Sequence, residues 1–336
     1  MNRISSITFL AALAASGLVS AAPAYTTPVG YITHTIAGNS GNSSDTYLSP
    51  TLVQPTIYAA ASTATPTTNT VSLPTGVPTG LDSTYVLEIT SGTSEGWWST
   101  ITSSTATSVV VNDTFPTGLT GNITVSIRKH NTVKTFLGAN APGLTPFNGV
   151  TASDEVQLLN PATQAVTTIA YVPKALSGAS EDGWYNLANS SLADNYIVEP
   201  GTAVKIKHRN SSTLTFVSSG VVKTTKTQVD VFTDTNWIGT TFAVGNTLNG
   251  MALNTQLVTF NGQSQIYDEL QYVNANQSVT PYAALNPSLG LGQTMGNLAT
   301  SQDAGAVVFP EGSGAVLKRK GSANSIITFA GTTVGQ

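Results

Sequence analysis

Carboxylate side chains are the residues of this sequence whose type and spacing best suit catalysis. They include three adjacent pairs: Asp154 with Glu155, Glu181 with Asp182, and Asp268 with Glu269. Neighbouring side chains on a strand point to opposite faces, whereas a glycoside hydrolase needs two carboxyl groups that converge across about 5 to 9 Å. The pairs therefore favour structural roles in turns. The stretch with Asp182, Asp194 and Glu199 remains a candidate acidic loop for a carbohydrate hydrolase or a weak Ca²⁺ site.

Other catalytic patterns are weak. Residues 92–96, Gly-Thr-Ser-Glu-Gly, match the G-x-S-x-G nucleophile elbow, but that elbow requires a helix directly after the turn, and residues 97–102 alternate as a strand does. Three scattered histidines and no cysteine offer no ligand set for zinc. Residues 290–296 miss the glycine spacing of a dinucleotide site. We therefore predict no catalytic residue, no metal and no cofactor.

Basic side chains are concentrated in three similar stretches, residues 125–136, 204–216 and 316–329. Each pattern predicts a β-hairpin, because an alternating strand leads into a basic cluster, a polar turn and a second strand that ends in Thr-Phe. If the hairpins share a face, they form a positive stripe for an anionic polysaccharide or cell-surface glycan. Alternatively, the charges protect edge strands from pairing with another chain. The candidate anion-binding residues are Arg128, Lys129, Lys205, Lys207, Arg209, Lys318, Arg319 and Lys320.

Aromatic side chains support a second binding hypothesis, because sugar-binding faces use exposed Trp and Tyr. The candidate glycan-binding aromatics are Trp97, Trp98, Trp184 and Tyr185. Trp97 and Trp98 are adjacent on a predicted strand, so we expect one in the core and the other partly exposed. The alternative is that all of these rings serve core packing.

The elements that must position these residues are predicted to be strands. Short alternating runs such as residues 31–36 and 85–90 are separated by clusters of Gly, Pro, Asn and Ser, which is typical of strands and turns. Only 9% of the residues are charged and 40% are hydrophobic, against about a quarter charged in ordinary domains. This composition excludes a disordered chain, and its low charge removes one defence against edge-to-edge association.

An internal repeat indicates a modular architecture. The run Asp-Glu-Val-Gln-Leu that starts at residue 154 returns as Asp-Glu-Leu-Gln-Tyr at residue 268, and Lys207 has a later counterpart in Lys318. We predict an all-β fold of tandem small β-sandwich or β-barrel modules with an internal duplication and little helix. The predicted boundaries are 1–21 signal peptide, 22–138 first β module, 139–149 linker, 150–224 second β module and 225–336 third β module, which repeats the second.

The first 21 residues have the features of a secretory signal peptide. Arg3 precedes an apolar run, and Val19 and Ala21 form an A-x-A-like cleavage site. The run is shorter than the ~20 residues that span a membrane. We therefore expect export to the periplasm, cell surface or extracellular space, with no transmembrane segment after cleavage. A net charge of −4 also argues against nucleic acid as a partner.

Three stretches carry a resemblance to a known group of sequences: residues 88–97, residues 153–163 and residues 199–207. In these stretches the sequence resembles an uncharacterised family of secreted, β-rich, repeat-containing proteins from environmental Gram-negative bacteria. The resemblance covers most of the chain after the signal peptide and is weakest over residues 239–264. It implies export and β architecture, and it transfers no catalytic residue because the family has no assigned activity.

These observations lead to a ranked set of expected functions. The first is a secreted, non-enzymatic protein of the cell surface or extracellular matrix that acts by adhesion or self-assembly. The second is a glycan-binding protein that uses the basic hairpins and exposed aromatics. The third is an extracellular carbohydrate hydrolase with its site in the acidic loop.

Overall fold

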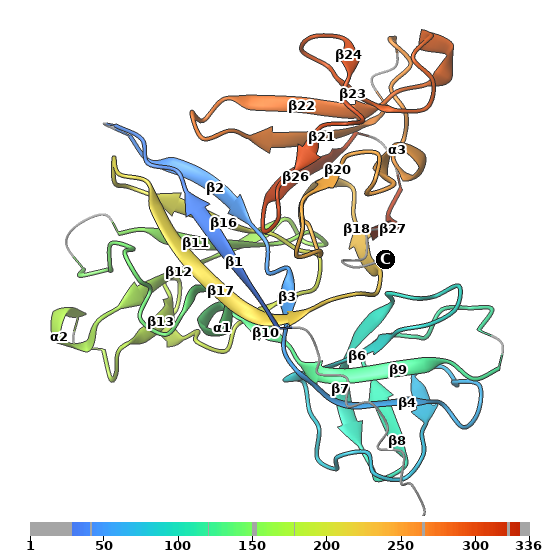
Figure 1. Cartoon of the computed structure of the whole chain (residues 1–336). Coiled ribbons are helices and arrows are strands. Elements are labelled where there is room, and N and C mark those ends of the chain that lie inside the picture. The colour runs from blue at the N-terminus through green and yellow to red at the C-terminus, as the bar shows by residue number, and fades with distance from the viewer. Residues whose placement is uncertain are drawn as a thin grey trace, which may run out of the picture.

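The computed structural model describes residues 29–40, 42–119, 121–149, 153–177, 179–263, 266–320 and 323–329. The predicted signal peptide, residues 1–21, lies outside these residues. Strands make up 45% of the structure and helices 5%, so the predicted all-β class is confirmed. The strands form three six-stranded antiparallel sheets together with smaller two- and three-stranded sheets (Figure 1).

The inserted module, residues 56–129, contains one six-stranded sheet and its own core (Figure 1). Its sequence alternates as the prediction requires: in the strand at residues 108–111, Val109 and Val111 are buried and their neighbours are half-buried. Leu87 and Ile127 are fully buried in the same core. The sheet order is β4-β9-β6-β7-β8-β5, with β4 (Thr56–Ala61), β5 (Thr70–Ser72), β6 (Tyr85–Ile89), β7 (Trp98–Ser104), β8 (Ser108–Val111) and β9 (Thr124–Lys129).

The central unit is formed by residues 29–53 and 130–222, which the inserted module separates in sequence. Its core contains Trp184, Ile206 and Phe216. Its six-stranded sheet has the order β14-β13-β12-β11-β16-β2, β1-β17-β3 form a second sheet, and β10 pairs with β15. The elements are β1 (Val29–Ile36), β2 (Ser44–Leu48), β3 (Leu52–Val53), β10 (Asn131–Thr132), α1 (Val133–Leu137), β11 (Glu155–Asn160), β12 (Ala165–Val172), α2 (Lys174–Ser177), β13 (Gly183–Asn186), β14 (Ser191–Leu192), β15 (Ile197–Val198), β16 (Val204–His208) and β17 (Leu214–Val222).

The C-terminal unit, residues 227–329, contains the third six-stranded sheet, in the order β24-β23-β22-β21-β26-β19. Strand β18 pairs with β27, and β20 with β25. The core includes Leu248, Met295 and Phe329. The elements are β18 (Thr227–Val231), β19 (Asp234–Gly239), β20 (Asn246–Thr247), α3 (Leu253–Gln256), β21 (Asp268–Val273), β22 (Val279–Ala284), η1 (Pro287–Leu289), β23 (Met295–Asn297), β24 (Gln302–Asp303), β25 (Val308–Phe309), β26 (Gly314–Arg319) and β27 (Ser325–Phe329).

The central and C-terminal units have the same strand order. Strand β11 corresponds to β21, β12 to β22, and so on in order until β17, which corresponds to β27. Strand β1 corresponds to β18, and β2 corresponds to β19. The repeated Asp-Glu pairs stand at the starts of the corresponding strands β11 and β21. The internal duplication itself stays a prediction from the sequence, but the two units share one architecture.

The strand pairing differs from the predicted module boundaries. Residues 29–53, which we assigned to the first module, pair with β16 and β17; Ser44, for example, stands opposite His208. The predicted linker, residues 139–149, has no helix or strand, but Ala141 is buried in the central core and the N–H of Thr145 donates to Asp154. Local patterns do not specify these boundaries, because the partner strands are far apart in the sequence.

None of the three predicted basic hairpins is formed. Strand β16 pairs with β11 and β2, whereas β17 pairs with β1 and β3. In the same way, β26 pairs with β19 and β21, and β27 pairs with β18. In these two stretches, the two strands of the predicted hairpin therefore enter different sheets.

In the stretch over residues 125–136, the predicted second strand is the helix α1. Thr132 is the N-cap, and it forms a capping box with Thr135. Val133, Phe136 and Leu137 are buried, and their spacing places them on one face of a helix. A helical turn therefore buries three apolar residues on one side, whereas a strand would expose some of them.

The central and C-terminal units contact each other along β2 and β19. Leu48 forms a β-bridge with Ser313, and Ile238 forms one with Thr202. Leu48 and Ile238 hold corresponding positions in β2 and β19, as do Thr202 and Ser313 before β16 and β26. The contact thus has the reciprocal form of a two-fold interface. The apolar residues of this contact are Ala203, Trp237, Val316, Tyr47 and Leu159.

Candidate functional site

The junction cleft is a cavity of about 350 Å³ at the meeting point of all three units. The inserted module lines it from the ends of β7 and β8, the central unit from the turn after β11 and the segment around β15, and the C-terminal unit from β18. Its polar and aromatic lining residues are Trp98, Thr100, Asn112, Asp113, Asn160, Tyr196, Glu199, Thr202, Asp230 and Phe232.

Three carboxylates give the junction cleft its electrostatic character. Asp113 follows β8, Glu199 follows β15 and Asp230 lies in β18, so each comes from a different unit. Glu199 is exposed at the cleft surface, but the protein around its carboxyl group partly desolvates it, and this desolvation and the charges of Asp113 and Asp230 raise its pKa. Asp230 is also exposed, and partial desolvation raises its pKa, with a contribution from the charge of Asp113. The cleft therefore favours hydrogen-bond donors and cations and disfavours anions.

The two adjacent tryptophans have the expected division of roles. Trp97 is buried in the inserted module, where its ring lies 4.8 Å from that of Phe115. Trp98 is half-buried and borders the junction cleft. Its indole Nε1 donates a 2.9 Å hydrogen bond to the carbonyl of Gln228 in β18, which holds the ring across two units. Trp98 is thus an aromatic surface that is already oriented at the cleft.

The other two candidate aromatics belong to the central core. Trp184 is 1% exposed and Tyr185 is 8% exposed. The indole Nε1 of Trp184 donates to the carbonyl of Gly138, and its ring packs against Tyr171 at 5.8 Å. Burial leaves neither face available to a sugar ring, so both side chains have a structural role.

The basic residues lie among carboxylates. Five of the eight candidates form ion pairs within the described part of the chain: Arg128 with Glu88, Lys205 with Asp45, Arg209 with Glu155, Arg319 with Asp268, and Lys320 with Glu269. Arg128 and Arg319 are also buried. Positive charge that is compensated at contact distance contributes little to the potential felt by an approaching anion.

The remaining three candidates also have polar or aromatic neighbours. Lys207 stands between Glu155 and Asp45 in the strand register, and Lys318 stands opposite Glu269. Opposite charges across neighbouring strands stabilise a sheet. Lys129 is exposed, with its ammonium 5.8 Å from the centre of the Tyr85 ring. The arrangement favours a sheet-stabilising role for most of these residues over a positive stripe.

The candidate acidic loop is divided by the fold. The Asp194 carboxylate accepts hydrogen bonds from the Lys134 ammonium at 2.6 Å and from the Trp184 N–H at 2.8 Å. Asp182 accepts from the N–H of Lys174 at 2.7 Å. Of the three proposed carboxylates, Glu199 is the one that lines the junction cleft. Its cleft neighbours Asp113 and Asp230 were not candidates in the sequence, because neither lies in a motif or close to the other.

No family model, curated protein or solved structure matches this chain. Within the described ranges, no group of three or more His, Asp or Glu side chains is placed to hold a metal ion. None of the helices seen in those ranges is long and apolar enough to span a bilayer.

Proposed function

We propose that the protein is an exported, non-enzymatic β protein that self-associates by pairing β4 with β4 of a second copy. The observation that carries this proposal is the position of β4 at the edge of the inserted module's sheet, where one side of its backbone has no partner strand among the described residues. An edge of this kind is a template for strand addition. Assembly on a cell surface or in an extracellular matrix is the corresponding activity.

The other edges of the three six-stranded sheets are either covered or short. Strands β2 and β19 are edges of their sheets, but each is covered by the opposite unit. Strands β14 and β24 have two residues each, and β5 has three, and short edge strands resist pairing with other chains. Strand β4 has six residues. It is therefore the longest uncovered edge of the three six-stranded sheets.

The chemistry of β4 also fits self-pairing. Residues 46–81 include no charged side chain, so two copies approach without like-charge repulsion or the desolvation of a charge. Ile57, Ala59 and Ala61 are exposed on β4. A bulge lies between Thr56 and Tyr58, which leaves the C-terminal part of the strand as the regular edge. Antiparallel pairing about a two-fold axis would join two six-stranded sheets into one.

A charge at the exposed edge tests this proposal. We expect the wild-type protein to dimerise with concentration in sedimentation velocity experiments, and Ala59→Lys to weaken dimerisation by at least about tenfold because lysines on edge strands oppose pairing. Val166→Lys is the matched control, since it adds the same charge at an exposed apolar residue of β12. A wild-type protein that stays monomeric at all concentrations, or equal dimerisation of Ala59→Lys, would contradict the proposal.

A second candidate function is binding of a neutral or amino sugar in the junction cleft. It is supported by the half-buried Trp98 beside the carboxylates of Asp113 and Glu199, because sugar rings stack on indoles and their hydroxyl groups donate to carboxylates. The basic clusters of the sequence predicted an anionic ligand, whereas the cleft favours a neutral or cationic one. Acidic glycans should be rejected by the three carboxylates.

A glycan array at low salt compares these ligand classes directly. We expect neutral or amino sugars to bind wild-type protein, and the double variant Asp113→Asn with Glu199→Gln to lose at least about tenfold in affinity, since charge-assisted hydrogen bonds are the strong ones. Glu181→Gln, an exposed carboxylate outside the cleft lining, should bind like wild type. Binding of acidic glycans alone, or binding that the double variant leaves unchanged, would refute a role for the cleft.

A further inference from the structure

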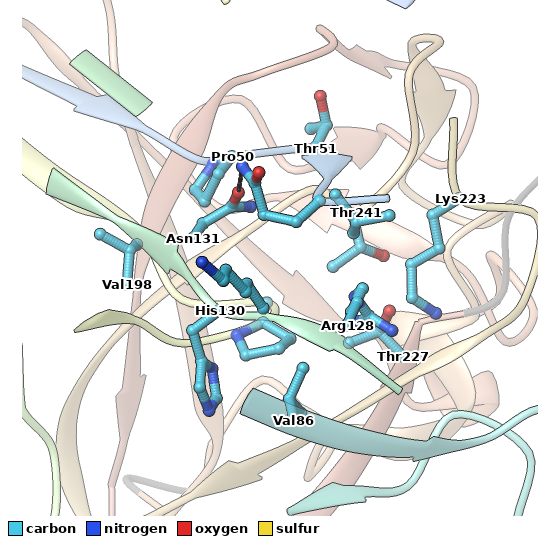
Figure 2. A pocket seen from close by; sticks show the side chains of 15 residues that line it. Pro50, Thr51, Val86, Arg128, His130, Asn131, Val198, Lys223, Thr227 and Thr241 are labelled. Atoms are coloured by element: carbon cyan, nitrogen blue, oxygen red, sulfur yellow. Dashed lines mark hydrogen bonds between the residues drawn. The ribbon is translucent and has the colours of Figure 1, made fainter. Parts of the chain in front are cut away.

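A second, much smaller cavity lies at the contact of the three units, with a volume of about 20 Å³ (Figure 2). Arg128 of β9 lines it from the inserted module, and Thr227 of β18 and Thr241 after β19 line it from the C-terminal unit. Lys223, which follows β17, completes the charged wall. A cavity of this size has room for one water-sized particle.

The charges at this cavity do not balance. The Glu88 carboxylate forms ion pairs with both the Arg128 guanidinium and the Lys223 ammonium, the latter at 2.5 Å. The side chains of these three residues are between 2% and 5% exposed. Burial lowers the pKa of Lys223 to about 8, so at pH 7 the cluster holds two cations and one anion. A buried excess of positive charge is costly unless an anion compensates it.

Polar atoms without a hydrogen-bond partner among the described residues belong to side chains that line the same small cavity. Arg128 Nη2 and the hydroxyls of Thr227 and Thr241 are buried and have no hydrogen-bond partner among the described residues. Figure 2 shows these three side chains gathered beside Lys223. A guanidinium nitrogen can only donate, so its partner must be an acceptor, and a buried donor without one carries the full cost of desolvation.

We infer that this cavity binds one monatomic anion of the halide class, with Arg128 Nη2 and the hydroxyls of Thr227 and Thr241 as donors. The free groups at the cavity are hydrogen-bond donors, so the ligand must be an anion. The cavity volume excludes sulfate and phosphate, because each is several times larger than one water molecule. The donors come from two units, the inserted module and the C-terminal unit, which the Trp98 hydrogen bond to Gln228 also joins. Bound halide therefore strengthens the attachment of the inserted module.

The first experiment measures thermal unfolding of the whole chain at constant ionic strength while chloride replaces gluconate. We expect a saturable rise in Tm with chloride, as binding to the folded state requires, and a similar rise with bromide. Crystals grown in bromide should show an anomalous peak beside Arg128. Equal Tm in chloride and gluconate together with no bromide peak would overturn the inference and leave a water as the occupant.

Isosteric variants separate halide binding from general salt effects. Thr227→Val and Thr241→Val each remove one donor with little change of volume, and we expect each to weaken the apparent halide affinity at least about tenfold. Thr240→Val is the matched control, because the Thr240 hydroxyl is also buried and unpartnered in the described structure but does not line this cavity. A chloride response that is unchanged in both Thr227→Val and Thr241→Val would also overturn the inference.

Discussion

At the scale of single residues, two histidines, His34 and His130, are buried. His34 is 2% exposed, its Nε2 lies 2.8 Å from the Ser218 hydroxyl, and its ring stacks on Phe216 at 4.8 Å. His130 is 3% exposed, and its Nε2 lies 3.1 Å from the Thr100 hydroxyl. Burial lowers the pKa of each imidazole from 6.5 to about 4. Both rings are therefore neutral at pH 7 and serve as packing and hydrogen-bonding groups.

These histidines make stability depend on pH. Between pH 6.5 and about 4 the unfolded chain binds protons that the folded chain does not, so the free energy of unfolding falls as the pH is lowered through this window. Each histidine contributes up to roughly 3 kcal/mol. Urea unfolding at pH 6.5 and 4.5 should show a smaller loss for His130→Gln than for wild type. An identical loss in the variant would show that His130 does not titrate in this way.

At the scale of elements, the corresponding strands β11 and β21 begin with the same arrangement, a buried aspartate that binds two neighbouring segments. Asp154 accepts from the N–H of Thr145 at 2.7 Å and contacts His208 Nδ1 at 2.9 Å. Asp268 accepts from the N–H of Val258 at 2.9 Å and from the guanidinium of Arg319 at 3.2 Å. In each unit a buried carboxylate thus connects the start of one strand to the end of its neighbour, and this explains the repeated Asp in the sequence.

The two aspartates should differ in importance. Asp268→Asn leaves the Arg319 guanidinium buried without its counter-charge, and breaking a buried pair in this way costs about 3 to 5 kcal/mol. Asp154→Asn should cost less, because imidazole can be neutral whereas guanidinium cannot. Chemical denaturation of both variants at pH 7 measures the difference. If Asp154→Asn were the more destabilising change, the counter-charge argument would fail.

At the scale of the whole molecule, the inserted module interrupts the central unit between β3 and β10 (Figure 1). The two ends of the insertion lie together: Gln54 Nε2 donates to Asn131 Oδ1 at 2.9 Å, and Asn131 Nδ2 donates to the carbonyl of Leu52 at 2.9 Å. The module also has a separate apolar core. An insertion with adjacent ends and its own core is the arrangement in which a domain can be removed without disrupting its host.

Removal of the module tests this arrangement. A chain in which two glycines replace residues 55–130 should retain cooperative unfolding and a β-type circular dichroism spectrum, because the central core is formed by residues outside the module. The same chain should lose the dimerisation that we propose for β4. Loss of cooperative unfolding would instead mean that the central unit needs the module in order to fold.

The sequence by itself determined the local states of the chain. Alternation in stretches such as residues 204–208 predicts strands, and burial of alternate side chains in β16 confirms it, because strand periodicity is a local property. The adjacent Trp97 and Trp98 were assigned to opposite environments for the same reason. The repeated Asp residues of the sequence fall at the starts of β11 and β21, which hold the same place in their sheets.

Only the tertiary structure decided which strands pair and which side chains meet. The stretch over residues 204–216 has the local chemistry of a hairpin, yet β16 pairs with β2 and β17 with β1, because the burial of apolar faces in two separate layers outweighs the short turn. For the same reason, Asp113, Glu199 and Asp230 converge from three units, although nothing in their local sequences connects them. Strand propensity is set by neighbours along the chain, whereas pairing and sites are set by contacts between distant segments.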